Sequence, residues 1–328
     1  MLQRFDERNR DLLVNINGAL VHRGKAGVSP FDSVVQGGDA VWEGLRLYDG
    51  RIFRLTEHLD RLRASALALA FTDIPSREEI AGELIRTLDA NHMTDGVHIR
   101  LTLTRGVKYT SGMDPRLNTA GPTLIVLAEH KPPVYDRGGV RLITSAIRRI
   151  PPDCVDQNIH SCNLINSILA KIQANAAGVD DALMLDLRGF VAETNATHVF
   201  VVRRGQVVTP TATSCPEGIT RAVVLELCAD HDVPTAVCDL SLTDVYAADE
   251  VFCSGTMGEL APVVEVDGRP IGAGVPGPLM GRLTAWFADL VSRSGTPIHS
   301  GPLDRSPSGT RPPAVHEAAA TSGSQPRG

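Results

Sequence analysis

The stretch from 155 to 202 constrains the fold most, because helical and strand patterns alternate within it over a short distance. Apolar residues recur at helical spacing from Leu164 to Ala177, and Gly178 suits the end of that helix. A strand is predicted over 182–186. After a turn, a second β-rich run over 190–202 carries Glu193. This layout predicts a mixed α/β fold.

The first 130 residues predict a two-layer unit of helices on an antiparallel sheet. Hairpin turns are indicated at Asn17-Gly18 and at Asp49-Gly50. A helical period begins near Thr56, which is a candidate N-cap. The other elements expected in this half are a helix over 76–90 and strands over 97–106 and 123–130.

Residues 131–138 are predicted to link this unit, residues 1–130, to a second domain over 139–293. Many short strands with turn signals predict a barrel-like sheet there. Strands are expected near 140–147, 182–186, 190–202, 206–208, 235–239 and 250–253, and helices near 164–177, 219–231 and 277–292. The segment 294–328 is rich in Pro, Gly and Ser, so it is predicted to be a disordered tail.

Composition narrows the function classes. The chain has 328 residues, of which 43% are apolar, enough for one large domain or two smaller ones. A net charge of −6 argues against a nucleic-acid partner. The six cysteines are scattered without metal-ligand spacing, so no metal site is predicted. The chain has no signal-like start and no apolar run long enough to span a membrane, which predicts a cytoplasmic protein.

Four sequence strings point to one family. They are VWEGLRLYDGRIFRLTEHLDRL, EGITRAVVLELC, FCSGTMGELAPVVEVDG and the run from Asn163 through Gly178, Asp186, Gly189, Val191 and Glu193 to Phe200. Together they resemble the class IV aminotransferases, the fold-type-IV pyridoxal-phosphate enzymes, which include branched-chain and D-amino-acid aminotransferases and aminodeoxychorismate lyase. The resemblance runs from about Val14 to Leu290. It implies an α/β (α+β) fold with a two-layer N-terminal domain, a pseudo-barrel C-terminal domain and a homodimer.

The resemblance also implies a phosphate site for the cofactor. Arg61 falls where the family has its phosphate-binding arginine, and a guanidinium fork suits a dianion. Ile219 and Thr220 open a helix whose free N–H groups favour an anion. Thr256 and the Gly255 backbone would give a second phosphate contact. The alternatives are a solvated helix arginine, an ordinary N-cap and a turn that ends a strand.

Two positions carry the implied chemistry. Glu193 matches the glutamate that keeps the pyridine nitrogen of the cofactor protonated, with a surface strand glutamate as the alternative. The family's Schiff-base lysine lies three or four residues before Asn163, and here those positions are His160 and Ile159. An imidazole has no primary amine, but it can transfer protons. His160 is therefore either a proton shuttle for a noncovalently held cofactor or a packing residue in a decayed site.

Other candidates for the missing amine are few, because the chain has only four lysines. Lys108 follows a TRG string in a loop that reaches the substrate pocket in relatives, so it is the predicted substitute. Lys171 is expected to face away from the site. Cys162 could be a nucleophile or a metal ligand, with a small buried apolar residue as the alternative. Trp42 lies where D-amino-acid aminotransferases carry a tyrosine. Both are assigned to the substrate pocket.

Three hypotheses follow. The first is an atypical class IV aminotransferase that uses pyridoxal phosphate or pyridoxamine phosphate to move an amino group between an amino acid and a 2-keto acid. The second is a non-catalytic homologue that binds the cofactor or a partner chain. The third is an enzyme that uses the same fold without the cofactor, relying on His160 and Cys162. The string VWEGLR is closer to the branched-chain members, but it leaves the substrate open.

Overall fold

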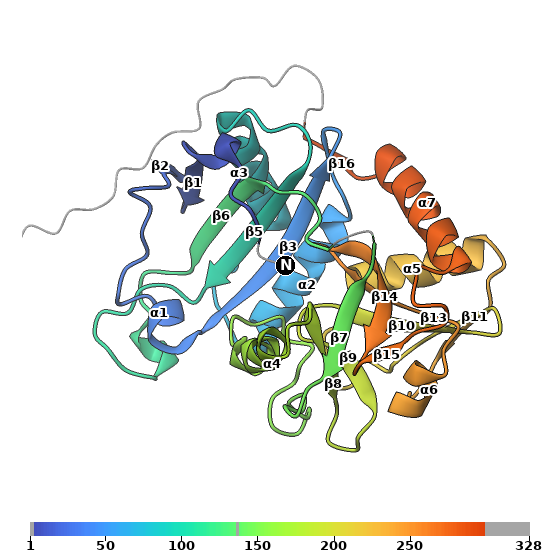
Figure 1. The fold of residues 1–328 in the computed structure, drawn as a ribbon. Coiled ribbons are helices and arrows are strands. Elements are labelled where there is room, and N and C mark those ends of the chain that lie inside the picture. The colour runs from blue at the N-terminus through green and yellow to red at the C-terminus, as the bar shows by residue number, and fades with distance from the viewer. Residues whose placement is uncertain (1–2, 136–137, 299–328) are drawn as a thin grey trace, which may run out of the picture. The chain divides into compact units, whose positions relative to one another are not determined.

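The computed structural model describes residues 3–135 and 138–298, which form two sheets with their helices (Figure 1). The first sheet has the strand order β16-β4-β3-β5-β6-β1-β2, and every neighbouring pair in it is antiparallel. Its strands are β1 (Leu13–Ile16), β2 (Ala19–His22), β3 (Ala40–Tyr48), β4 (Arg51–Ile52), β5 (Val97–Thr104), β6 (Thr123–His130) and β16 (Thr296–Pro297).

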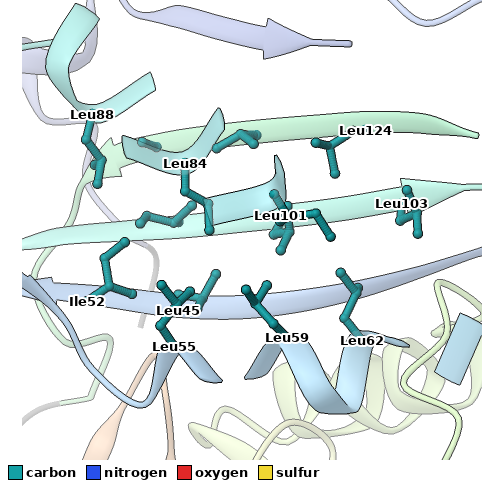
Figure 2. Close-up of a cluster of buried hydrophobic side chains, with 14 of the residues drawn as sticks. Leu45, Ile52, Leu55, Leu59, Leu62, Leu84, Leu88, Leu101, Leu103 and Leu124 are labelled. Atoms are coloured by element: carbon teal, nitrogen blue, oxygen red, sulfur yellow. The ribbon is translucent and has the colours of Figure 1, made fainter. Parts of the chain in front are cut away.

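Helices α2 (Leu55–Ala68) and α3 (Arg77–Ala90) pack on this sheet. Leucines from both helices meet leucines of β3, β5 and β6 in a continuous apolar core (Figure 2). This confirms the predicted two-layer unit, because each helix buries one apolar face against the sheet. A short helix α1 (Ser33–Gly37) and the 3-10 helices Glu7–Asn9 and Pro115–Leu117 complete this half.

The second sheet has the strand order β12-β11-β10-β13-β14-β7-β8-β9, and β15 pairs with β14. It curls as a half-barrel, because β9 leads through a tight turn back into β10. Its strands are β7 (Val140–Thr144), β8 (Asp181–Leu185), β9 (Val191–Thr194), β10 (His198–Arg203), β11 (Gln206–Thr209), β12 (Thr235–Val237), β13 (Glu250–Gly255), β14 (Glu259–Val266) and β15 (Arg269–Pro270).

Four helices accompany the second sheet: α4 (Ile165–Ala176), α5 (Ile219–Asp230), α6 (Leu242–Tyr246) and α7 (Pro278–Arg293). Helix α4 buries Ala170 and Ala174 against Ala182 and Met184 of β8. Helices α5 and α7 cover β10 and β13 through a separate apolar cluster. The predicted barrel-like sheet is thus confirmed as a curled sheet. Helix α6 was not predicted and accompanies the three expected helices.

Of two local predictions in the first half, the hairpin turn is confirmed and the helix N-cap is wrong. Asn17 and Gly18 both adopt positive φ angles of 48° and 80°, as the predicted hairpin turn requires. The predicted N-cap Thr56 is wrong. Arg54 holds that position with a φ of 51° and makes no side-chain capping bond, and the helix already includes Leu55.

The predicted start of the tail at residue 294 is also wrong. Residues 296–297 form strand β16, which pairs with β4, and Ile298 is buried in the first core. The remainder of the predicted disordered tail, residues 299–328, lies outside the described residues. Among the helices that the structure describes, none combines the length and the apolar character needed to cross a bilayer.

Candidate active site

A cavity of about 400 Å³ receives residues from both sheets. The first half supplies Trp42 and Gly44 from β3 and Arg61 from α2. The second half supplies the ends of β9 and β13, the start of β10 and the start of α5. His160 enters from the loop before α4. The cavity therefore exists only because the two halves of the chain fold together.

Glu43 lies buried behind one wall of the cavity, where it contacts the lining residues Arg61 and His160. Its carboxylate is fully buried and accepts two hydrogen bonds from Arg61, at 2.8 and 2.7 Å. His58 Nδ1 lies 2.6 Å from the same carboxylate. Burial alone would raise the pKa of Glu43, but the hydrogen bonds from Arg61, His160 and His58 bring that pKa well below its ordinary value. Glu43 is thus held as an anion that fixes the Arg61 guanidinium.

The His160 imidazole is held in a defined orientation. Its Nδ1 lies 2.6 Å from the Trp42 carbonyl oxygen and 3.4 Å from Glu43 Oε1. Because a carbonyl oxygen only accepts, Nδ1 must carry the hydrogen. Burial lowers the pKa of His160, so the neutral ring keeps its free lone pair on Nε2. The ring also stacks on the Trp42 indole at 4.3 Å between centroids.

Trp42 also contacts Arg100, whose guanidinium carbon lies 3.4 Å from the centroid of the Trp42 ring. Arg100 donates in addition to the Cys162 sulfur at 3.9 Å. Burial raises the pKa of the Cys162 thiol, and the positive charge of Arg100 offsets part of that rise. Cys162 is therefore a thiol held by Arg100, outside the lining of the cavity.

The N-terminus of α5 offers an anion site. Gly218 is its N-cap and provides no side-chain acceptor, so the first N–H groups of the helix keep their capacity to bind a ligand. The same cavity is lined by Ser254, whose buried hydroxyl has no hydrogen-bond partner within the described residues. Thr220 and Thr256 also line this part of the cavity. An orphaned hydroxyl in a cavity with an uncapped helix start fits an oxyanion such as a phosphate.

Arg61 reaches the same region. Its Nε and Nη2 are bound to Glu43, and Nη1 donates to the Glu217 carbonyl at 2.8 Å. Three of the five N–H groups of a guanidinium are thereby used, which leaves two for a ligand. The site can therefore bind an anion with a pre-positioned arginine as well as with backbone amides.

Glu193 lies at another part of the cavity, on β9. Its carboxylate lies 2.8 Å from Arg149 Nη2. Burial raises the pKa of Glu193 to about 7, and Arg149 offsets only part of this rise. Arg149 is itself held by Ser214, Asn166, Ser167 and Gln157. Glu193 can thus hold or share a proton near neutral pH.

Glu193, His198 and Cys215 bring one donor atom each to within 4.8 Å of one another, a grouping that could hold a metal ion. The surrounding charge disfavours this. Arg149 contacts Glu193, and the positive charges of Arg221 and Arg61 act on His198. A field of this sign favours anions over cations. The charges around the cluster therefore favour an anion over a metal ion in this cavity.

The predicted site residues fall into two groups. The structure brings Trp42, Arg61, His160, Glu193, Ile219, Thr220, Gly255 and Thr256 together around the cavity. It does not bring Lys108 there. Lys108 lies in the loop after β5, where its Nζ donates to the Gly112 carbonyl at 2.5 Å. Cys162 also stays outside the lining.

The expectation that Lys171 faces away from the site is wrong, because this residue lines the cavity. Its Nζ lies 3.0 Å from Asp181 Oδ1, and Asp181 also accepts a hydrogen bond from Asn195. The Lys171 side chain is therefore paired with a carboxylate. Helical spacing measured from Asn163 gave no sign of this pairing.

Sequence reasoning passed over four residues that shape the site: Glu43, Arg149, His198 and Ser254. Glu43 and Ser254 lie inside two of the strings with a family likeness, VWEGLR and FCSGTMGE. Arg149 stands in an Arg-Arg pair shortly before two prolines, with no pattern that points to Glu193. Only the tertiary structure shows that these side chains converge.

This architecture, a two-layer α/β unit and a curled sheet that line one cavity together with the uncapped start of α5, is that of the fold-type-IV enzymes. Residues 40–266 match the family model described as amino-transferase class IV. The solved T.th. branched-chain amino acid aminotransferase with pyridoxamine 5'-phosphate superposes with a TM-score of 0.80 at 33% identity, covering 86% of this chain and 94% of that one.

Relatives found by sequence similarity are also named as aminotransferases or aminotransferase-like proteins. The chain is 55% identical to branched-chain-amino-acid aminotransferase-like protein 2 of Arabidopsis thaliana over 88% of its own length, but it spans only 52% of that protein. It is 41% identical to a putative branched-chain-amino-acid aminotransferase of Methanocaldococcus jannaschii, covering 87% of this chain and 99% of the relative. The chain belongs to the class IV aminotransferase family.

Proposed function

We propose that this chain binds pyridoxal phosphate or pyridoxamine phosphate without a covalent bond and transfers an amino group between an amino acid and a 2-keto acid. The names of the relatives favour a branched-chain substrate. The observation that carries the proposal is the orphaned Ser254 hydroxyl in one cavity with the uncapped start of α5 and with Glu193. A phosphate site and a buried acid in one cavity match the two ends of this cofactor.

The proposed binding roles follow from position. Arg61, Thr220, Thr256, the Gly255 backbone and the Ile219 amide would hold the phosphate, and Glu193 would face the pyridine nitrogen. When bound, the cofactor would supply an electron-withdrawing ring that stabilises negative charge on a substrate carbon. Because Glu193 is buried with a raised pKa, a proton shared with a ring nitrogen would lie in a low-dielectric environment.

His160 would move the proton that the family's lysine moves. Its Nδ1 hydrogen is committed to the Trp42 carbonyl, so Nε2 is the basic atom. The stacked Trp42 ring limits rotation of the imidazole. Proton transfer from a fixed imidazole needs no lysine amine.

The positions of Lys108 and Lys171 favour a second candidate function, in which the chain binds the cofactor but does not catalyse amino-group transfer. Lys108 lies outside the cavity lining, and Lys171 is paired with Asp181. In this alternative the cavity would bind the phosphorylated cofactor, and His160 would only pack against Trp42.

The test is a titration of the purified chain with pyridoxal phosphate, followed by borohydride treatment and mass spectrometry. We expect a saturable change in absorbance, loss of the cofactor on dialysis and no reduced adduct on any lysine. Transfer of an amino group from a branched-chain amino acid to 2-oxoglutarate would then separate the enzyme from the binding homologue. Failure of a folded chain to bind the cofactor would refute both.

We also propose that the chain forms a homodimer through α4. Ile165, Ile168, Leu169 and Ile172 recur at helical spacing, and each is 43% exposed or more. An exposed apolar stripe of this kind is typical of a protein interface. Sedimentation equilibrium at micromolar concentration should give twice the chain mass, and Ile168→Asp with Ile172→Asp should give a monomer. A monomeric wild-type chain would contradict the proposal.

A further inference from the structure

His198 begins strand β10 and lies directly opposite Ser254 of β13. Residues opposite each other in an antiparallel pair project from the same face of the sheet, so both side chains point toward the cavity that they line. Within the described residues, the buried Ser254 hydroxyl has no hydrogen-bond partner, so this face of the sheet holds an unused polar group. The imidazole, unlike the Ser254 hydroxyl, can also change its charge.

The His198 ring rests against the N-cap of α5. A Cβ placed on Gly218 would lie 2.2 Å from His198 Nε2, so glycine at 218 is what lets the imidazole approach the helix. Nε2 therefore lies beside the free N–H groups with which α5 begins. An anion bound to those groups would come within reach of the ring.

Three of the six groups that face His198 are positively charged: Arg221 of α5, Arg61 of α2 and Arg149 after β7. The others are the neutral imidazole of His160 before α4, the Glu193 carboxyl and the Cys215 thiol. Burial, followed by the charges of Arg221 and Arg61, lowers the pKa of His198 to about 3. The ring is neutral while the anion site is free, and a dianion at α5 would favour its protonated form.

We propose that His198 is an anion ligand that takes up a proton when a dianionic group binds at the N-terminus of α5. The inference deepens the proposed function and rests on it, because the phosphate of the cofactor is the expected dianion. Free phosphate or sulfate has the same chemistry at this site. A proton-linked ligand would make binding of the phosphorylated group stronger as the pH falls toward neutrality from above.

Isothermal titration calorimetry with sulfate tests the proposal, because sulfate stays a dianion over the whole working pH range. Titrations in two buffers of different ionisation enthalpy give the number of protons taken up. We expect the wild-type chain to take up about one proton more per sulfate than His198→Asn, since Glu193, whose pKa is raised to about 7 in the same cavity, contributes the same uptake to both. The affinity should be about 10-fold weaker in the variant because a charge-assisted hydrogen bond is lost.

Two further variants provide controls. His231 stacks on Trp286 at the opposite end of α5, at 3.8 Å between ring centroids, so His231→Asn should bind sulfate with wild-type affinity and proton uptake. Ser254→Ala should weaken binding but keep the proton uptake. Circular dichroism melts verify that each variant is folded, and His198→Gln replaces His198→Asn if the latter does not fold.

The outcomes separate the two levels of inference. Proton uptake by a folded His198→Asn variant that equals the wild-type uptake, or sulfate binding without uptake by the wild type, would overturn the role of His198. Displacement of sulfate by pyridoxal phosphate, but not by pyridoxal, would identify the cofactor phosphate as the dianion. Sulfate binding with uptake that pyridoxal phosphate cannot displace would leave the role of His198 intact and would count against the proposed function.

Discussion

Replacing His160 with lysine is expected to give the chain a covalent attachment to pyridoxal phosphate that the wild-type chain lacks. The backbone of residue 160 is already fixed at the cavity wall, since its N–H donates to Ser65 Oγ and its carbonyl accepts from the Trp42 N–H. An extended amine from this position would enter the same cavity as Glu193 and the start of α5. The covalent adduct should be present in the His160→Lys variant and absent from the wild-type chain.

The chemistry is simple. The introduced amine nitrogen would bond to the aldehyde carbon, the aldehyde oxygen would leave as water, and borohydride would reduce the resulting carbon–nitrogen double bond to a stable secondary amine. Mass spectrometry should then find about one cofactor per chain on the peptide that contains position 160. Burial and the charge of Arg61 act to lower the pKa of a basic group at this position, while Glu43 acts to raise it, and the net effect on His160 is a lowered pKa. The same balance should favour the nucleophilic form of the new amine.

Two further variants test whether the adduct forms only on a lysine at position 160. His160→Gln should bind the cofactor without any adduct, because an amide is not a nucleophile. Lys171→Arg should leave the adduct of the His160→Lys variant unchanged, because the native ammonium is paired with Asp181. A reduced adduct on Lys171 or Lys108 in the wild-type chain would contradict the assignment of the proton-moving role to His160.

The secondary structure followed from the sequence wherever local chemistry decided it. The hairpin at Asn17-Gly18 and the helix after Ser76, which has a full capping box with Glu79, depend on side chains close in the chain. Strand β14 is not among the expected strands, and it contains Pro262, a residue type that is disfavoured in a central strand. It forms nevertheless between β13 and β7, which supply partners from distant parts of the sequence.

In the candidate site, too, some residues could be predicted from local sequence and others depend on distant partners. Arg61, Glu193 and Thr220 could be predicted because they lie in strings with a family likeness. Arg149 and His198 could not, because each acts through neighbours that only the fold brings close: Glu193 for Arg149, and Gly218 with Ser254 for His198. Lys171 lines the cavity although its place on the helix predicted otherwise. The sequence places residues on elements, but the tertiary fold decides which elements meet.

Glu43→Ala is expected to lower the free energy of unfolding by about 3–5 kcal/mol, since it leaves the Arg61 guanidinium and the buried His58 side chain without their anionic partner. The Glu43 carboxylate is fully buried and compensates the Arg61 guanidinium while accepting from His58. His58 is itself 2% exposed and loses its partner at the same time. Urea unfolding followed by circular dichroism measures this change.

The same substitution should weaken anion binding, because Arg61 loses the two hydrogen bonds that orient it toward the cavity. Glu43→Gln keeps the volume and one acceptor, so its loss of stability should be smaller. Glu57→Ala is the matched control on the surface of α2: Glu57 is 44% exposed at its side chain and pairs with Arg54, so its removal should cost less than about 1 kcal/mol.

These two controls decide what Glu43 does. If Glu43→Gln restores stability but not sulfate affinity, the negative charge on Glu43 is needed to orient Arg61, and packing alone is excluded. If Glu43→Ala proves as mild as Glu57→Ala, Arg61 and His58 must find other partners in the folded variant, and the view of Glu43 as the anion that organises this wall fails. The short contacts of Glu43 with both side chains, and the burial of His58, make that second result the less compatible with the structure.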